Sequence, residues 1–360
     1  PVTDTRSFRS DNFTTLIAHA VEGYNHGSQM ENDRGDGWGC VMYCSIGAAD
    51  FTPLRQMTRI IWPTILRACR WDALCRDIFG SRWSMRKGAR PGLIRSGFHE
   101  LGVHLMMDLN DVAALVTGGG SGMGAVTARV LAERGARVVV LDVNLENAQH
   151  TAESIGGFAV SADVSNGPSV EAALQSAIDE VGVPRVVVSC AGIAPASRIV
   201  GRDGPHDLDL YQQVINVNLV GTFNVLRLAA ARMTGLDPVS DSGSRGVIVN
   251  TASVAAYEGQ IGQAAYSASK GGVVALTLPA ARELARFGIR VMTIAPGLIG
   301  TPMLLNMPDE VQQSLAGQVP FPQRFGEPQE YGQLVLHIVD NEMLNGEVIR
   351  LDGAIRLQPK

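Results

Sequence analysis

The amino-acid sequence predicts an α/β protein with a doubly wound, seven-stranded parallel sheet, preceded by an N-terminal extension of uncertain structure. Three observations support this fold. Apolar runs alternate with helix-forming stretches from residue 112 onwards, a glycine-rich turn follows the first run, and polar residues or glycines follow most later runs. Such alternation is typical of parallel sheets, because each strand must return to the same edge through a crossover.

The predicted strands are short and mostly apolar on both faces, as buried parallel strands are. They are, in order, VAALVTGG (112–119), RVVVLDV (137–143), GFAVSADV (157–164), RVVVSCAG (185–192), GVIVNTAS (246–253), RVMTIAPG (290–297) and GEVIRLDG (346–353). Helices are predicted between them, including one over 211–233 and a long one from Gln263. Ligands of doubly wound sheets bind at the carboxyl ends of the strands, so we expect the functional site there.

Composition describes a globular chain of 360 residues, with 46% hydrophobic and 18% charged residues and a net charge of −5. This mild acidity gives no reason to expect a nucleic-acid partner. No run of about 18 apolar residues occurs, so we predict no membrane span. All four tryptophans and four of the five cysteines precede residue 107, which indicates that two different compositions are joined.

We therefore divide the chain into an extension, 1–106, and a single catalytic domain, 107–360. The extension shows no strand–helix alternation, and we expect it to be dispensable for catalysis or partly disordered. Its cysteine spacings, C-x3-C and C-x5-C, match no tight zinc pattern, so we expect no metal site. Neither a secretory signal nor a transit peptide is indicated. We expect a bacterial cytoplasmic protein; a mitochondrial one is the alternative if the source is eukaryotic.

A glycine-rich turn, TGGGSGMG (117–124), joins the first strand to its helix. Its T-G-x-x-x-G-x-G pattern places glycines at Gly118, Gly122 and Gly124. Glycines there let a pyrophosphate approach the amides at a helix N-terminus, whereas Gly119 and Gly120 could be loop filler. Asp142 ends the second strand, where a carboxylate binds the adenosine ribose and repels a 2′-phosphate. The sequence therefore predicts NAD rather than NADP, unless Asp142 only caps the next helix.

Two further strand ends deliver groups to the same edge of the sheet. Asp163 and Val164 follow the third strand, where the aspartate side chain and the valine amide can meet the adenine. Cys190 and Gly192 follow the fourth strand, and we expect them beside the cofactor.

The stretch TASVAAYEGQIGQAAYSASKGG (251–272) holds the catalytic candidates. The chain has three lysines among many arginines, and Lys270 stands four residues after Tyr266, so both point the same way from a helix. The ammonium should lower the tyrosine pKa from about 10 and make it a general base. Ser253 should hold the substrate oxygen. Asn218 could bind a water that connects Lys270 to solvent.

These groups predict hydride transfer from a secondary alcohol to a nicotinamide, with Tyr266 taking the hydroxyl proton. A buried tyrosine, an N-capping serine and a helix-surface lysine are the structural alternative, and each is common singly. Their occurrence together behind a dinucleotide turn favours catalysis.

The motifs TGGGSGMG, NVNLVG, YSASK and IAPGLIGTP, with Ser253, resemble those of the short-chain dehydrogenase/reductase superfamily across residues 110–360. The narrower resemblance is to its type II 3-hydroxyacyl-CoA dehydrogenases, also described as 17β-hydroxysteroid dehydrogenases, and includes QVPFPQRFGEP and LNGEVIRLDGAIRLQP. It implies NAD, oxidation of (S)-3-hydroxyacyl-CoA to 3-oxoacyl-CoA in fatty-acid β-oxidation, and a homotetramer. The cofactor contacts that it implies are Ser121, Met123, Asp142, Asp163, Val164, Cys190, Tyr266, Lys270, Ile299 and Thr301.

The chain also departs from the superfamily pattern. Most members have Asn-Asn-Ala-Gly where this chain has Ser-Cys-Ala-Gly, so Ser189 and Cys190 replace two asparagines. This difference raises a question about the packing behind the fourth strand. By the family's pattern, 301–323 forms a lid beside the nicotinamide. Its apolar residues would suit an acyl chain or a steroid, or else pack on the core; they are Met303, Leu304, Leu305 and Met307.

Three other functions stay open besides 3-hydroxyacyl-CoA oxidation. One is a hydroxysteroid dehydrogenase, and another is an NADPH-linked 3-oxoacyl reductase, which Asp142 disfavours. The third is a non-catalytic scaffold subunit, which would not need Asn218, Ser253, Tyr266 and Lys270 together. We expect a small-molecule substrate, either an acyl-CoA or a steroid-like alcohol.

Overall fold

The computed structural model describes residues 107–202 and 204–359, and in that part of the chain seven strands form one sheet. All of its strands pair in parallel, in the order β3-β2-β1-β4-β7-β8-β9. The strands are β1 Ala113–Thr117, β2 Arg137–Asp142, β3 Phe158–Ser161, β4 Val186–Ser189, β7 Gly246–Thr251, β8 Ile289–Pro296 and β9 Val348–Leu351. The predicted fold class is therefore confirmed, while the predictions made for 1–106 lie outside the described residues.

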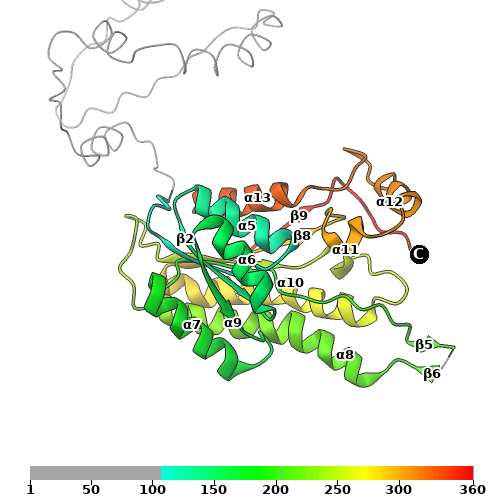
Figure 1. The fold of residues 1–360 in the computed structure, drawn as a ribbon, viewed down its shortest axis with the longest axis horizontal. Coiled ribbons are helices and arrows are strands. Elements are labelled where there is room, and N and C mark those ends of the chain that lie inside the picture. Colours follow the sequence, from blue (N-terminus) through cyan, green and yellow to red (C-terminus); the bar gives the residue numbers. More distant parts are fainter. Residues whose placement is uncertain (1–106, 203, 360) are drawn as a thin grey trace, which may run out of the picture. The chain divides into compact units, whose positions relative to one another are not determined.

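Helices cover both faces of the sheet (Figure 1). One face packs on α5 (Gly122–Glu133), α6 (Leu145–Ile155) and α13 (Pro328–Asp340). The other packs on α7 (Gly167–Val181), α9 (Gly221–Met233) and α10 (Ala264–Leu284). The strands separate two apolar layers, which explains why their sequences are apolar at consecutive positions rather than alternating.

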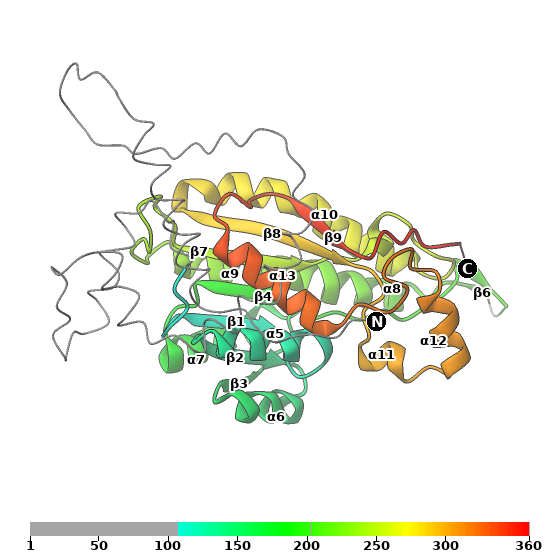
Figure 2. The same cartoon turned by 90° about the horizontal axis from the view of Figure 1, so that it is seen from above.

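The carboxyl ends of the strands share one edge, where the shorter elements lie (Figure 2). These are η2 Val254–Ala256, α11 Pro302–Leu305, α12 Asp309–Ala316 and the antiparallel pair β5 Val200–Gly201 and β6 Gly204–Pro205. The connections after β1 and after β4 leave in opposite directions along the sheet. The crevice between these two strands is therefore the expected ligand site.

A continuous helical segment precedes β7, formed by α8 (Leu208–Ile215), the π-helical turn η1 (Asn216–Val220) and α9. By length and composition alone this segment, Leu208–Met233, is apolar enough to cross a membrane. Half of its most apolar window is buried, and Val225, Leu226 and Met233 pack in the core against the sheet. Packing accounts for this apolar character.

Candidate active site

The glycine turn after β1 is packed too tightly to carry side chains. At Gly118, whose φ is +64°, a Cβ would lie 2.7 Å from the backbone nitrogen of Ala191. Gly119 and Gly120 are not filler either, because a Cβ at each would lie 2.8 Å from a side chain, that of Val140 and of Asn147 respectively. The turn therefore brings the start of α5 against the ends of β2 and β4.

Asp142, at the end of β2, organises this turn. One carboxylate oxygen accepts a hydrogen bond from the Gly120 amide at 2.9 Å, and the other accepts from the Asn144 amide at 3.0 Å. Asn144, not Asp142, caps α6, because its side chain accepts from the Asn147 amide. The capping alternative for Asp142 is therefore excluded. The carboxylate lies directly beside the turn, where an adenosine ribose would meet it.

The residues after β3 lie at the next position along the edge. Val164 is buried, and its carbonyl accepts a hydrogen bond from the Asn224 side chain at 3.0 Å. Asp163 is exposed, and its carboxylate accepts from the amide and the hydroxyl of Ser165. Both residues therefore lie at the end of the strand next to β2, the strand that ends in Asp142, and the adenine contact stays a prediction.

Gly192, Asn218 and Lys270 meet at one point beyond β4. A Cβ on Gly192 would lie 3.2 Å from the Asn218 side-chain oxygen and 3.5 Å from Lys270 Nζ. Asn218 is fully buried in the π-helical turn. Its amide accepts from the Ile193 amide at 2.8 Å and donates to the Ile193 carbonyl and to Ser269 Oγ. The Asn218 side chain thus clamps the loop after β4 to α10.

Ser253 and Tyr266 face each other across the start of α10. Ser253 follows β7, and its hydroxyl accepts from the Ala255 amide at 3.1 Å as the cap of η2. Tyr266 as a whole is partly buried, but protein atoms crowd its hydroxyl. This desolvation raises the pKa of Tyr266, and interaction with the Ser253 hydroxyl opposes the rise.

Lys270 lies deeper than the sequence indicates. It is 4% exposed, and its ammonium donates a 2.7 Å hydrogen bond to the Thr251 carbonyl. Burial lowers the pKa of Lys270 to about 8, against the influence of Cys190. Its Nζ lies 5.8 Å from the centre of the Tyr266 ring. The expectation that Lys270 lowers the tyrosine pKa is therefore wrong here, because desolvation outweighs a distant ammonium that is committed to Thr251.

A buried hydroxyl network stands behind Lys270, and no sequence motif indicated it. The Thr251 hydroxyl shares a 2.7 Å hydrogen bond with the hydroxyl of Tyr331, on α13. Both hydroxyls lie 3.7 Å from the Cys190 sulfur. Burial raises the pKa of the Cys190 thiol, so it stays neutral in this surrounding. Thr251 thus bonds through its hydroxyl to Tyr331 on α13 and through its carbonyl to Lys270 on α10.

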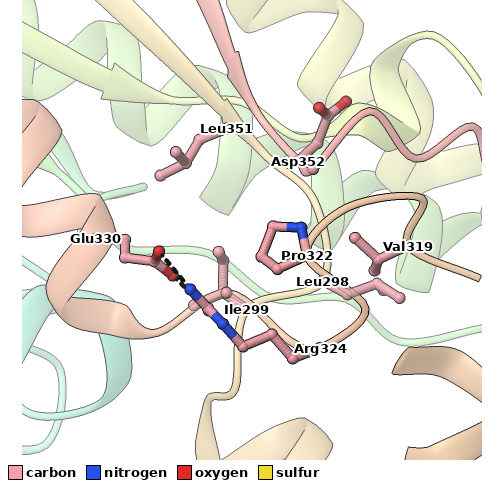
Figure 3. A pocket seen from close by; sticks show the side chains of 10 residues that line it. Leu298, Ile299, Val319, Pro322, Arg324, Glu330, Leu351 and Asp352 are labelled. Carbon is pink, nitrogen blue, oxygen red and sulfur yellow. Dashed lines mark hydrogen bonds and ion pairs between the residues drawn. The ribbon is translucent and has the colours of Figure 1, made fainter. Parts of the chain in front are cut away.

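The end of β8 supplies the last predicted contacts. Gly122 faces Thr301, since a Cβ added to Gly122 would lie 3.4 Å from the methyl group of Thr301. Ile299 is buried and borders a cavity of about 140 Å³ between the loop after β8 and the end of β9. Figure 3 shows Arg324 and Glu330 joined by two 2.8 Å hydrogen bonds among its lining residues. This cavity lies behind Ile299 and does not include the catalytic candidates.

The predicted lid forms α11 and α12, held together where Gln312 donates to the carbonyls of Leu305 and Met307 at 2.9 and 2.7 Å. No side chain of α12 is buried, and Leu305 is 52% exposed. Packing on the core therefore does not explain Leu305, and an exposed leucine close to Thr301 suits an apolar substrate.

The residues present fit a nicotinamide dinucleotide. The first amides of α5, a 12-residue helix, have no intrahelical acceptors and can bind a pyrophosphate. Asp142 stands where the adenosine ribose would bind, and Lys270 would hold the nicotinamide ribose. Among the described residues no group of three or more His, Cys, Asp or Glu side chains is placed to bind a metal.

Known proteins share both the sequence and the fold. The short chain dehydrogenase family matches residues 112–312. The 3-hydroxyacyl-CoA dehydrogenase type-2 of Bos taurus is 55% identical over 253 residues, which are 69% of this chain and 96% of that protein. The protein of that name from Homo sapiens is 53% identical over 252 residues, with the same coverage.

A crystal structure of 3-hydroxyacyl-CoA dehydrogenase type-2 from Mycobacterium avium is similar to this chain with a TM-score of 0.68 and 42% identity. The match covers 71% of this chain and 100% of that one. The likenesses in sequence and in structure thus lead to the same group of proteins. The chain belongs to the short chain dehydrogenase family and is an oxidoreductase.

Proposed function

We propose that this chain oxidises (S)-3-hydroxyacyl-CoA to 3-oxoacyl-CoA with NAD, as a step of fatty-acid β-oxidation. The observation that carries the proposal is the placement of Ser253, Tyr266 and a buried Lys270 at the carboxyl edge of the sheet, beside a dinucleotide turn. Relatives at 53–55% identity are named for this activity, which supports the substrate class.

The roles of the side chains follow from their surroundings. Ser253 donates to the substrate oxygen and orients it toward Tyr266, which takes the hydroxyl proton. A nicotinamide held beside these residues would supply the acceptor for the hydride that leaves the same carbon. Lys270 holds a positive charge 5.8 Å from the centre of the Tyr266 ring, anchored by the Thr251 carbonyl. Since burial raises the pKa of Tyr266, this charge and the bound cofactor must offset that cost during proton transfer.

Asp142 supports NAD over NADP. Its carboxylate is held beside the glycine turn by the Gly120 and Asn144 amides, so it cannot swing away from a 2′-phosphate without losing both hydrogen bonds. An NADPH-linked reductase is therefore disfavoured by geometry as well as by charge.

The substrate assignment rests on the apolar lid as well as on the relatives' names. Exposed Leu305 beside Thr301 suits an acyl chain or a steroid, so a hydroxysteroid is the second candidate substrate. We further propose a homotetramer in the bacterial cytoplasm, and that 107–360 forms the single catalytic domain.

The experiment measures NADH formation by the full chain with 3-hydroxybutyryl-CoA and, separately, with a 17β-hydroxysteroid. NAD and NADP are compared, and Tyr266→Phe is the control. We expect NAD-dependent turnover of the acyl-CoA that the control abolishes. Turnover of the steroid alone would move the assignment to the second candidate. If the folded wild-type chain turns over neither substrate, both dehydrogenase assignments fail and the non-catalytic scaffold is the remaining function.

A further inference from the structure

The segment that joins the two catalytic regions is held by the last strand of the sheet. Residues 257–263, here termed the connector, run from η2, which follows Ser253, to α10, which carries Tyr266. The connector bonds to β9 and to residues 352–359, to which the function proposed above assigns no role.

Arg350, on β9, is the centre of these contacts. Its two terminal nitrogens donate to both carboxylate oxygens of Glu258, at 2.7 and 2.9 Å. Its Nε donates to Asp352 at 2.7 Å, and a terminal nitrogen also donates to the Ile355 carbonyl at 3.0 Å. The guanidinium carbon lies 5.1 Å from the centre of the Tyr257 ring. Arg350 thus contacts two consecutive residues of the connector, and Arg356 adds a longer, 3.5 Å ion pair with Glu258.

The Arg350–Glu258 pair is shielded enough to fix geometry. The Arg350 and Glu258 side chains are 21% and 23% exposed, and that of Asp352 is 8% exposed. The hydrogen bonds that Arg350 donates, to Glu258 first and then to Asp352, raise the pKa of Arg350, so the guanidinium stays charged. Charge-assisted bidentate pairs of this kind are more directional than exposed ion pairs.

A second set of contacts holds the far end of the connector. The Ile261 amide donates to the Pro359 carbonyl at 3.0 Å, and the Gln260 side chain donates to the Gln358 carbonyl at 3.0 Å. Gln260 also bonds to Gln263, the residue that precedes α10. Both ends of the connector are therefore anchored to the same short stretch of chain.

We propose that Arg350 is a positioning residue that sets the separation of Ser253 and Tyr266 by holding Tyr257 and Glu258. The inference rests on the function proposed above. The connector begins four residues after Ser253 and ends three before Tyr266, so a shift of Glu258 is passed on to both hydroxyls. A misplacement of about 1 Å at reacting groups costs on the order of 10²-fold in rate.

The test is a double-mutant cycle of Arg350→Met and Glu258→Gln in the full chain. We expect each substitution to lower kcat by about ten- to hundredfold, with KM for NAD changed less than about threefold. The double variant should lose less than the product of the two single losses, because the Arg350–Glu258 pair is broken in each single variant. In Glu258→Gln, Arg350 keeps its bonds to Asp352 and Ile355, and in Arg350→Met, Glu258 keeps its ion pair with Arg356. Effects that multiply in the double variant would overturn the proposal.

Arg134→Met is the matched control. It breaks the pair with Asp340 that joins α5 to α13 through two hydrogen bonds of 3.1 and 3.2 Å, away from the connector. This variant should keep the wild-type kcat, and an equal loss in Arg134→Met and Arg350→Met would show a general packing effect that contradicts positioning.

A second readout does not depend on turnover. Amide hydrogen exchange, followed by mass spectrometry, should rise over 257–266 in Arg350→Met and stay at the wild-type rate there in Arg134→Met. If the wild-type chain forms no NADH, the proposed function fails, and the exchange measurement still decides whether Arg350 holds the connector. Unchanged exchange over 257–266 in Arg350→Met would overturn the proposal.

Discussion

Lys270 Nζ donates a 2.7 Å hydrogen bond to the backbone carbonyl of Thr251, the last residue of β7, whose side chain is bonded to Tyr331 on the opposite face of the sheet. The ammonium is thus fixed to the sheet itself and not only to its own helix. Four percent exposure leaves it almost no contact with solvent. Its ionisation is therefore set by the protein interior.

The free energy of unfolding of the cofactor-free chain should depend on pH because of the ionisation of Lys270. Folding lowers the pKa of Lys270 from 10.5 to about 8, so between these values the unfolded chain binds a proton that the folded chain has lost. Raising the pH from 8 to 10.5 therefore favours the folded state, by up to about 1.4 kcal/mol per pH unit. The raised pKa values of Cys190 and Tyr266 act in the opposite direction.

Comparison with Lys270→Met isolates the lysine contribution, because the other groups titrate in both chains. The unfolding free energy of the wild type, measured by urea titration, should rise relative to that of the variant between pH 8 and 10.5. A constant difference across this range would show that Lys270 keeps its ordinary pKa in the folded chain.

Tyr266→Phe should lower kcat by on the order of 10²–10⁴, because the general base is lost. Ser253→Ala should lower it by on the order of 10²–10³, because one donor to the substrate oxygen is lost. Steady-state NADH formation measures both. Ser176→Ala is the control, since this exposed hydroxyl bonds only within its helix, and it should keep full activity. Loss of less than about threefold in Tyr266→Phe would remove the tyrosine from the chemistry.

Asp142→Asn should reduce the preference for NAD over NADP by about tenfold or more. The amide oxygen can still accept from Gly120, so the turn keeps its shape, while the charge that repels a 2′-phosphate is removed. The ratio of kcat/KM values for the two cofactors measures this, with exposed Asp179→Asn as the control. An unchanged ratio would mean that a group other than Asp142 distinguishes the NAD ribose from the 2′-phosphate of NADP.

Ser189→Asn should raise the melting temperature. Within the described residues, the Ser189 hydroxyl and both polar atoms of the Asn250 side chain are buried without a protein hydrogen-bond partner. Ser189 and Asn250 are register partners on β4 and β7, so their side chains leave the same face. A longer amide at 189 can bond to Asn250.

Each kcal/mol gained raises the melting temperature by about 2–4 °C in a domain of this size. Calorimetry on the wild type, Ser189→Asn and Ser189→Ala measures the effect, with the alanine variant as the control that offers no new partner. A lower melting temperature in Ser189→Asn would show that the site is too narrow for the amide.

A chain beginning at Met107 should keep the activity of the full chain. The family match lies within 112–312, and relatives of 96% coverage align with only 69% of this chain. Nearly their whole length therefore has a counterpart in about two thirds of this sequence. Equal kcat and KM for both chains would support 107–360 as the catalytic domain, whereas loss of soluble, folded protein would show that the extension contributes to stability.

The fold and the placement of the candidate catalytic residues at one edge of the sheet could be predicted from sequence because each has a local signal. Seven apolar runs mark the strands, and a glycine turn followed by an acid marks the nucleotide side. Tyr266 and Lys270 share a helix face through their spacing alone. The alternation of strands and helices predicted that the strands are parallel. In the structure the glycine turn, Asp142, Tyr266 and Lys270 all lie at one edge of that parallel sheet.

The features that were missed depend on distant parts of the chain. Thr251 anchors Lys270 through a backbone carbonyl, which any residue type provides, so the sequence contains no signal for it. Tyr331 reaches Thr251 from a helix 80 residues away. The raised pKa of Tyr266 is a result of packing density around its hydroxyl, which spacing cannot report.

The connector also has a consequence for the newly made chain. Glu258 and Arg350 are separated by 92 residues, and β9 is the final strand of the sheet. At about 5–20 residues per second, a ribosome adds Arg350 roughly 5–20 s after Glu258. During that interval the helix that carries Tyr266 can already lie on the sheet while its leading segment has no anchor. On the proposed role of Arg350, a nascent chain would gain the full positioning of Ser253 and Tyr266 only after residues 350–359 are in place, so chains that lack them would hold the nucleotide turn with a slower turnover.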